Sequence, residues 1–145
     1  MLAENTVLTG RRAITRSYAK INLTLDVLSK RENGYHDIKM IMQTVSLFDL
    51  ILVDKTHKGI SISTNLPYLP CNEKNIAYKA ADAFFKATCI RGGAKIVIHK
   101  NIPVAAGLAG GSGNCAAVLT AMNMLHGNPL SNDELMHIGA VSYTH

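Results

Sequence analysis

The chain has 145 residues, of which 48% are hydrophobic and 17% charged, and its formal net charge is +5. This length and hydrophobic content support one globular domain, which we expect to span residues 1–145. The positive charge favours anionic ligands, and nucleotides and RNA both qualify. The sequence has no arginine-rich tail, so nothing in the charge distribution argues specifically for nucleic acid.

The sequence also lacks signals for export or membrane insertion. The opening residues include Glu4 and no apolar core, which excludes a secretory signal, and every long apolar stretch is broken by polar residues. Cys71, Cys89 and Cys115 are an odd set without C-x-x-C spacing, which is typical of reduced thiols and gives no zinc framework. The histidines show no ligand spacing either. We expect a soluble, cytoplasmic protein with no membrane partner and no metal-ligating residues, in which Cys115 lies in the core.

Strands come first along the chain. Alternating apolar and polar residues predict strands over residues 16–27, 39–47, 50–54 and 60–64, with turns at 30–37 and 56–59. A helix is predicted over residues 74–87, followed by a short strand over 94–99. Because the strands precede the helices and do not alternate with them, the fold class is α+β, with a mostly antiparallel sheet and helices on one face.

Two further helices complete the pattern. Apolar residues recur at helical spacing after Gly113, which predicts a helix from near Ser112 until the Gly127-Asn-Pro129 stop signal. A capping box formed by Ser131 and Glu134 starts a last helix that we expect to end at about Ile138.

The stretch PVAAGLAGGSGNCAA, from Pro103 to Ala117, carries the strongest chemical signal. Its four glycines, Gly107, Gly110, Gly111 and Gly113, have no Cβ and can turn their amides toward one anion. The helix that follows adds amide donors and the positive end of its dipole. The pattern predicts a phosphate site.

Other interpretations of this loop are weaker. No lysine follows the glycines, so the loop is not a Walker A motif. The segment from Gly111 to Ala116 fits a loose dinucleotide-binding pattern, but a long loop separates the preceding strand from the glycines, where that fold needs a tight turn. A glycine-rich turn that only lets a helix pack closely remains the structural alternative.

Two segments nearer the start of the chain indicate which kind of phosphate-binding protein this is. The segments SYAKINLTL (Ser17 to Leu25) and NGYH (Asn33 to His36), together with PVAAGLAGGS, resemble the GHMP kinase superfamily of galactokinase, homoserine kinase, mevalonate kinase and phosphomevalonate kinase. Within it, they resemble the branch that phosphorylates 4-diphosphocytidyl-2-C-methyl-D-erythritol in non-mevalonate isoprenoid synthesis. The resemblance extends from Ser17 to about Ala140, and it implies an ATP-dependent, Mg²⁺-requiring kinase with a small-molecule substrate.

The resemblance also implies roles for individual residues. Lys20 would be catalytic, supporting the phosphate acceptor electrostatically, because phosphoryl transfer depends on charge and alignment. Asn22, Tyr35 and His36 would bind substrate, with the last two on its cytosine. One departure is Gly113, where the family commonly has a second serine. The implied ATP-binding residues are Asn75, Lys100, Pro103, Gly107, Leu108, Gly110, Gly111, Ser112 and Asn114.

The end of the chain departs further from the family. Members continue into a G-A-D motif, whose aspartate is the catalytic base, and then into a second domain; here that aspartate would fall on His145. We therefore expect a fragment that lacks the base, is inactive alone and is prone to self-association. The alternative function is a non-catalytic nucleotide- or RNA-binding module, since the fold is shared with a ribosomal-protein domain. Few aromatic residues (three Phe, no Trp) make nucleic acid an unlikely partner.

Overall fold

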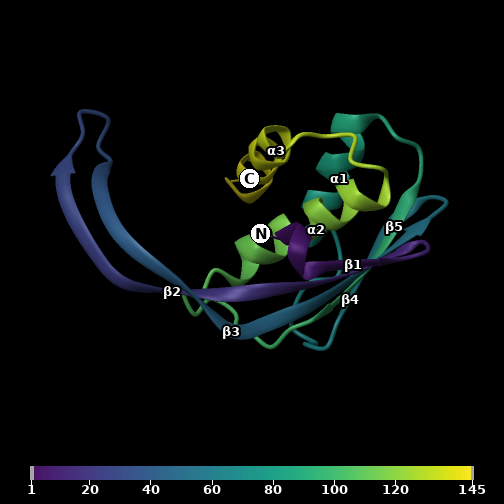
Figure 1. Ribbon diagram of the computed structural model, residues 1–145, viewed down its shortest axis with the longest axis horizontal. Helices are drawn as coiled ribbons and strands as arrows, with labels where there is room; N and C mark the ends of the chain where they lie inside the picture. Colours follow the sequence, from purple (N-terminus) through teal and green to yellow (C-terminus); the bar gives the residue numbers. More distant parts are fainter. Residues whose placement is uncertain (1, 145) are drawn as a thin grey trace.

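The computed structural model describes residues 2–144, with side chains from residue 4 to residue 143, so the expectation for His145 lies outside the described residues. One sheet carries all the helices on one face (Figure 1), as predicted for an α+β domain. Its strand order is β1-β2-β3-β5-β4. The elements are η1 (Leu2–Asn5), β1 (Thr6–Thr9), β2 (Arg12–Lys30), β3 (His36–Thr56), β4 (Gly59–Thr64), α1 (Ile76–Thr88), β5 (Gly93–His99), α2 (Gly110–Leu125) and α3 (Asn132–Thr144).

Strand pairing is mostly antiparallel, as predicted. Strand β2 pairs antiparallel with β1 and β3, and β3 pairs antiparallel with β5. Strands β4 and β5 are parallel, because helix α1 connects them and returns the chain to the end of the sheet at which β4 begins. The prediction omitted β1, a short strand whose pairing with β2 runs from Thr6 opposite Thr15 to Thr9 opposite Arg12.

The prediction of separate strands over 39–47 and 50–54 was wrong, since β3 runs unbroken from His36 to Thr56. Tyr18 of β2 pairs with Phe48 of β3, and Lys20, two residues further along β2, pairs with Thr44, four residues away on β3. The extra residues of β3 form a β-bulge close to the expected break. Beyond it, β2 and β3 continue as a two-stranded arm that extends past the helices and bends toward the side of the sheet on which they lie (Figure 1).

The core lies between the inner sheet face and helices α1 and α2. Ile51, Val53 and Ile96 are fully buried on the sheet, facing Phe84 of α1 and Val118 of α2. Cys115 is also buried, as predicted, and burial raises the pKa of its thiol to about 11.

The helix termini follow local chemistry. Asn75 caps α1 by accepting a hydrogen bond from the Ala77 amide at 2.9 Å. The predicted capping box is present: the Ser131 amide donates to Glu134 at 2.7 Å, and the Glu134 amide donates to the Ser131 hydroxyl at 3.2 Å. These bonds lower the pKa of Glu134. Helix α3 continues past the expected end to Thr144, and Gly139 lies within it, close to Leu119 of α2. None of the helices in residues 2–144 is long and apolar enough to cross a membrane.

Candidate functional site

A cleft of about 420 Å³ opens between the segment before α1, the end of β5 and the loop before α2. The loop over residues 103–109 forms one side, and the first turn of α2 closes the end. Lys74 and Tyr143, which the sequence analysis did not single out, also line it. Ser112 is the one predicted ATP-binding residue outside the lining, which includes Asn75, Lys100, Pro103, Gly107, Leu108, Gly110, Gly111 and Asn114.

The loop backbone alternates between positive and negative φ. Ala105, Gly107 and Ala109 have φ of 58°, 74° and 60°, whereas Ala106 and Leu108 have negative φ. Such alternation turns successive amides toward one side and forms an anion-binding concavity. Left-handed φ is uncommon for alanine, so two residues of this loop are held under strain.

The four glycines have different backbone conformations. Only Gly107 of the four has a positive φ, while Gly110, Gly111 and Gly113 belong to the first turn of α2. Helix α2 begins at Gly110, two residues earlier than expected, with Ala109 as its N-cap and no side-chain capping bond. Its first amides and positive dipole end face the cleft, where an anion would be stabilised.

The two cleft glycines at the start of α2 have different surroundings. A Cβ at Gly110 would lie 3.2 Å from both Lys100 Nζ and Ile102 Cγ2, so this residue packs on the floor of the cleft. A Cβ at Gly111 would have nothing within 4 Å. Gly111 is therefore the position at which a side chain can be added without disturbing the helix.

Lys100 and Asn75 have side chains that the fold already engages. Lys100 Nζ donates to Asp49 Oδ2 at 2.5 Å in an ion pair with side-chain exposures of 6% and 0%. Asn75 donates to the Pro70 carbonyl at 2.8 Å as well as capping α1. The polar side-chain atoms of Lys100 and Asn75 are therefore already hydrogen-bonded within the protein. A ligand in the cleft would contact these two residues partly through other atoms, including those of the main chain.

Two buried oxygens at this end of α2 find no hydrogen-bond partner among the described residues. They are Asn114 Oδ1 and Ser17 Oγ, on residues that are 3% and 1% exposed. Ser17 lies against Gly113, where an added Cβ would be 2.7 Å from its hydroxyl oxygen. Gly113, the departure from the family pattern, thus gives β2 room to approach α2. The Ser112 hydroxyl turns back to the Ala109 carbonyl at 3.2 Å.

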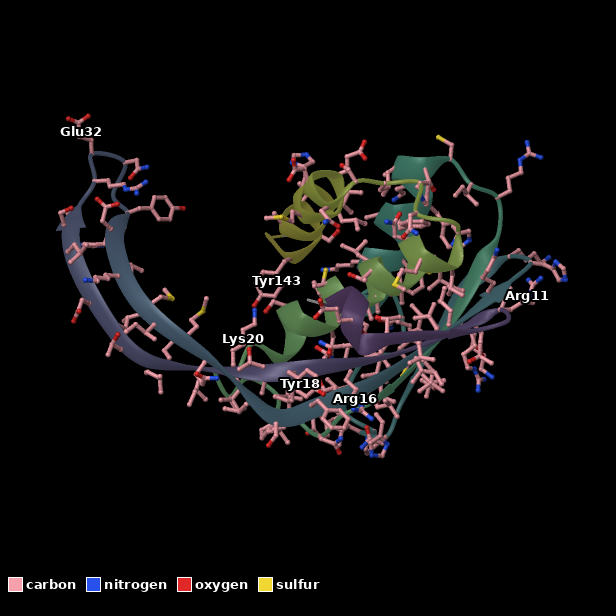
Figure 2. All side chains as sticks on the ribbon, viewed as in Figure 1. Arg11, Arg16, Tyr18, Lys20, Glu32 and Tyr143 are labelled. Carbon is pink, nitrogen blue, oxygen red and sulfur yellow. The ribbon has the colours of Figure 1, made fainter. Side chains whose placement is uncertain are left out.

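Lys20 and Asn22 lie at the base of the arm, next to the loop. The Lys20 amide donates to the Leu108 carbonyl at 3.1 Å, which ties β2 to the loop. The Lys20 side chain points to the side of β2 on which the helices lie, and Tyr143 points from α3 toward it (Figure 2). Lys20 and Asn22 are paired with Thr44 and Met42, so both side chains are on this face of the arm.

Tyr35 and His36 lie at the tip of the same arm. The prediction that His36 lies in the turn was wrong: His36 is the first residue of β3 and pairs with Lys30 of β2. Tyr35 is 74% exposed, and its amide donates to Asn33 Oδ1 at 3.1 Å. The structure does not bring this pair to Lys20: the six residue steps from Met42, which pairs with Asn22, to His36 cover roughly 20 Å along the strand.

An apolar surface separates these two groups of residues. Pairing and alternation place it on the arm face that carries Lys20 and Asn22, between them and His36. The surface, called the arm face below, consists of Leu25, Val27, Ile38, Met40 and Met42, each at least 40% exposed.

The opposite face of the sheet carries a smaller cluster that bears on the RNA alternative. The Arg16 guanidinium lies 5.3 Å from the centre of the Phe48 ring, and Tyr18 meets the same ring edge-on at 5.4 Å. Arg16 points away from the helices in Figure 2. The chain has few aromatic residues, yet two of them gather with an arginine on this face, an arrangement on which a nucleic-acid base can stack. Binding of RNA therefore stays a prediction.

Sequence reasoning missed Asp49, Ala105, Ala109, Lys74 and Tyr143. Asp49 had a signal, since it is an acid inside the otherwise apolar run from Leu47 to Val53. The alanines had none, because a left-handed backbone conformation is not expected of alanine. Across the part of the chain that the structure describes, no three His, Cys, Asp or Glu side chains gather as a metal site.

The chain matches known kinases in sequence. Residues 75–144 match the family model described as GHMP kinases N terminal domain. A 4-diphosphocytidyl-2-C-methyl-D-erythritol kinase of Clostridium botulinum is 50% identical over 124 residues, covering 86% of this chain and 44% of that protein. The enzyme of the same name from Clostridium kluyveri is 49% identical over 126 residues, covering 87% and 45%. The chain thus spans less than half the length of these relatives.

Solved structures agree in fold. A crystal structure of 4-(cytidine 5'-diphospho)-2C-methyl-D-erythritol kinase superposes with a TM-score of 0.78 at 32% identity, over 89% of this chain and 45% of that one. Homoserine kinase from Cytophaga hutchinsonii has a TM-score of 0.74 at 19% identity, over 94% and 42%, and supports the fold alone.

Proposed function

Because residues 75–144 match the family model of the GHMP kinase N-terminal domain, we propose that the chain is the nucleotide-binding part of a kinase that transfers phosphate from ATP to a hydroxyl of 4-diphosphocytidyl-2-C-methyl-D-erythritol. The observation that carries the proposal is the loop of alternating φ that leads into the N-terminus of α2 at one end of the cleft. This arrangement suits a polyphosphate, because its amides converge on one anion.

The nucleotide phosphates would lie on the amides of residues 105–111, with the rest of the nucleotide extending toward Asn75 and Lys74. Mg²⁺ is proposed to enter as part of the MgATP substrate, since the described residues offer no acidic cluster that would hold it. Lys74 supplies a cation at the cleft wall, whereas the charge of Lys100 is already balanced by Asp49.

The phosphate acceptor would lie along the arm face. A cytidine diphosphate derivative is elongated, with a base at one end and the acceptor hydroxyl near the other, and the arm places candidate residues for the two ends apart. Tyr35 and His36 at the tip would bind the base, and Lys20 and Asn22 at the base of the arm would hold the hydroxyl end. The bond from the Lys20 amide to Leu108 fixes the acceptor side against the phosphate loop, which in-line transfer requires.

A substitution at Gly111 tests the nucleotide site. Gly111→Asp adds a carboxylate where the structure leaves open space, and an acid in the first turn is favourable for the helix. We expect the variant to fold as the wild type does and to lose ATP affinity by about tenfold or more through charge repulsion. Gly111→Ala is the matched control and should bind ATP within about threefold of wild type, since it adds no charge.

Binding is the appropriate measurement, because the chain spans only 44% of its relatives. Calorimetric titration of each variant with MgATP gives the affinity, and circular dichroism confirms the fold. Equal ATP affinity in Gly111→Asp and Gly111→Ala would place the phosphates elsewhere. In a parallel titration, the affinity for the cytidine substrate should fall in Tyr35→Ala and stay unchanged in Gly111→Asp.

A further inference from the structure

Asp49 is a fully buried carboxylate that the proposed function does not yet use. Its Oδ2 accepts the ion pair from Lys100 at 2.5 Å. Its Oδ1 accepts the main-chain amides of Asn101 at 2.7 Å and Ile102 at 2.8 Å. Both carboxylate oxygens therefore bind three consecutive residues, Lys100, Asn101 and Ile102, which lie between the end of β5 and the loop.

The first of these residues, Lys100, is also bound through its main chain by Asn65. The Lys100 amide donates to Asn65 Oδ1 at 2.7 Å, and Asn65 Nδ2 donates to the Lys100 carbonyl at 3.1 Å. The amides of residues 100, 101 and 102 thus all bind side chains. Asp49 and Asn65 form a clamp on the segment that enters the loop.

This clamp reaches the phosphate site through packing. Ile102 is 1% exposed, and its side chain and the Lys100 amine both lie beneath Gly110, each 3.2 Å from where a Cβ would stand. At the other end of the loop, the Leu108 carbonyl is bound by the Lys20 amide. The loop is thus fixed at both ends, by β3 through Asp49 and by β2 through Lys20.

Anchoring matters because the loop is strained. Ala105 and Ala109 hold left-handed φ of 58° and 60°, conformations that persist only where the surroundings impose them. Without the bonds to Asp49, the loop relaxes from this strained conformation and its amides no longer converge. We propose that Asp49 is a positioning residue of the phosphate site, holding the strained loop and the first turn of α2 in their anion-binding arrangement through Lys100, Asn101 and Ile102.

A purely structural ion pair predicts something different. Removing one partner of a buried pair leaves an uncompensated charge and destabilises the whole domain, so every slowly exchanging amide would exchange faster together. A positioning residue predicts faster exchange at the loop anchors beyond any change in the core. The amides of Lys20, bound to Leu108, and of Gly113, bound to the Ala109 carbonyl at 2.9 Å, report the loop. Amides of β5 report the core.

The experiment measures amide hydrogen exchange by NMR in wild type, Asp49→Ala and Asp49→Asn. We expect exchange at Lys20 and Gly113 to rise by about tenfold or more in Asp49→Ala relative to the β5 amides. Asp49→Asn combined with Lys100→Met keeps an oxygen for the two loop amides and removes the unpaired ammonium, so it should restore slow exchange. Asp54→Asn is the matched control, because Asp54 is on the same strand in an ion pair with Arg12 at 2.6 Å on the outer face.

The inference rests on the proposed nucleotide site, and ligand binding separates the two. In Asp49→Ala, we expect affinity for ATP to fall by about tenfold and affinity for adenosine, which has no phosphate, to change by less than about twofold. The role of Asp49 would be overturned if the amides of Lys20 and Gly113 exchanged faster only to the extent that the β5 amides do. It would also be overturned if the affinities for ATP and for adenosine fell by the same factor. Wild type that binds no ATP, but whose reporter amides respond as expected, would overturn the proposed function and leave loop positioning by Asp49 standing.

Discussion

Replacing Gly113 by alanine places a methyl group 2.7 Å from the Ser17 hydroxyl oxygen, closer than unbonded atoms approach in folded proteins. Alanine is favoured over glycine inside a helix by about 1 kcal/mol. Overpacking a buried contact costs about 1–3 kcal/mol, so Gly113→Ala should lower the free energy of unfolding by about 1 kcal/mol.

Ser17→Ala has the opposite effect. The hydroxyl is buried without a partner among the described residues, and removing it relieves a desolvation penalty of about 1–3 kcal/mol, part of which is offset by lost packing. We expect a gain of about 1 kcal/mol. In the double variant the clash is absent and the helix gains its alanine, so the free energy of unfolding should rise by about 2 kcal/mol.

The two single changes sum to about zero, so the predicted coupling is about 2 kcal/mol. Urea unfolding followed by circular dichroism on the four proteins measures it. Additive effects, with a coupling below about 0.5 kcal/mol, would show that Ser17 and Gly113 do not determine the approach of β2 to α2.

Four further predictions follow from other parts of the molecule. Cys71 and Cys89 are exposed and should react with a thiol reagent in the native protein, whereas Cys115 should react only on unfolding. Because the pKa of Cys115 is raised to about 11, its contribution to stability is complete below the ordinary thiol pKa and is lost as the pH rises to about 11; Cys115→Ala should remove that slope from urea unfolding at pH 8 to 11. Ala109→Gly should relieve left-handed strain and raise the free energy of unfolding by about 1 kcal/mol; an unchanged midpoint in urea would refute strain there. Self-association through the arm face should weaken in Leu25→Ser with Met40→Ser, which are directly paired, with no loss of thermal stability; light scattering that shows the same mass as wild type would exclude this surface.

The helices and most of the sheet could be predicted because their signals are local. The capping box at Ser131, the apolar spacing of α2 and the alternation in β5 are each contained in one segment. The unbroken β3 could not be predicted, because a β-bulge against β2 maintains pairing where the alternation along the strand falters. Helix α3 was predicted too short, because Gly139 lies within the helix and does not end it.

For the candidate site, the sequence located the loop but not the source of its shape. Counting glycines assigned the anion-binding backbone to Gly110, Gly111 and Gly113, whereas the left-handed residues besides Gly107 are Ala105 and Ala109. That conformation depends on anchors far away in sequence, at Asp49 and Lys20. The curvature of the arm, and with it the separation of Tyr35 from Lys20, also depends on bulges that no local pattern reveals.

The central claim is that nucleotide phosphates bind at the loop and the first turn of α2. Titrating the ¹⁵N-labelled chain with MgATP and following its amide resonances tests this claim directly. The account predicts the largest shifts at residues 105–114, with smaller changes at Lys74 and Asn75 and none on the outer sheet face around Arg16. Shifts confined to that outer face, or to the strands around Lys20 without the loop, would contradict it.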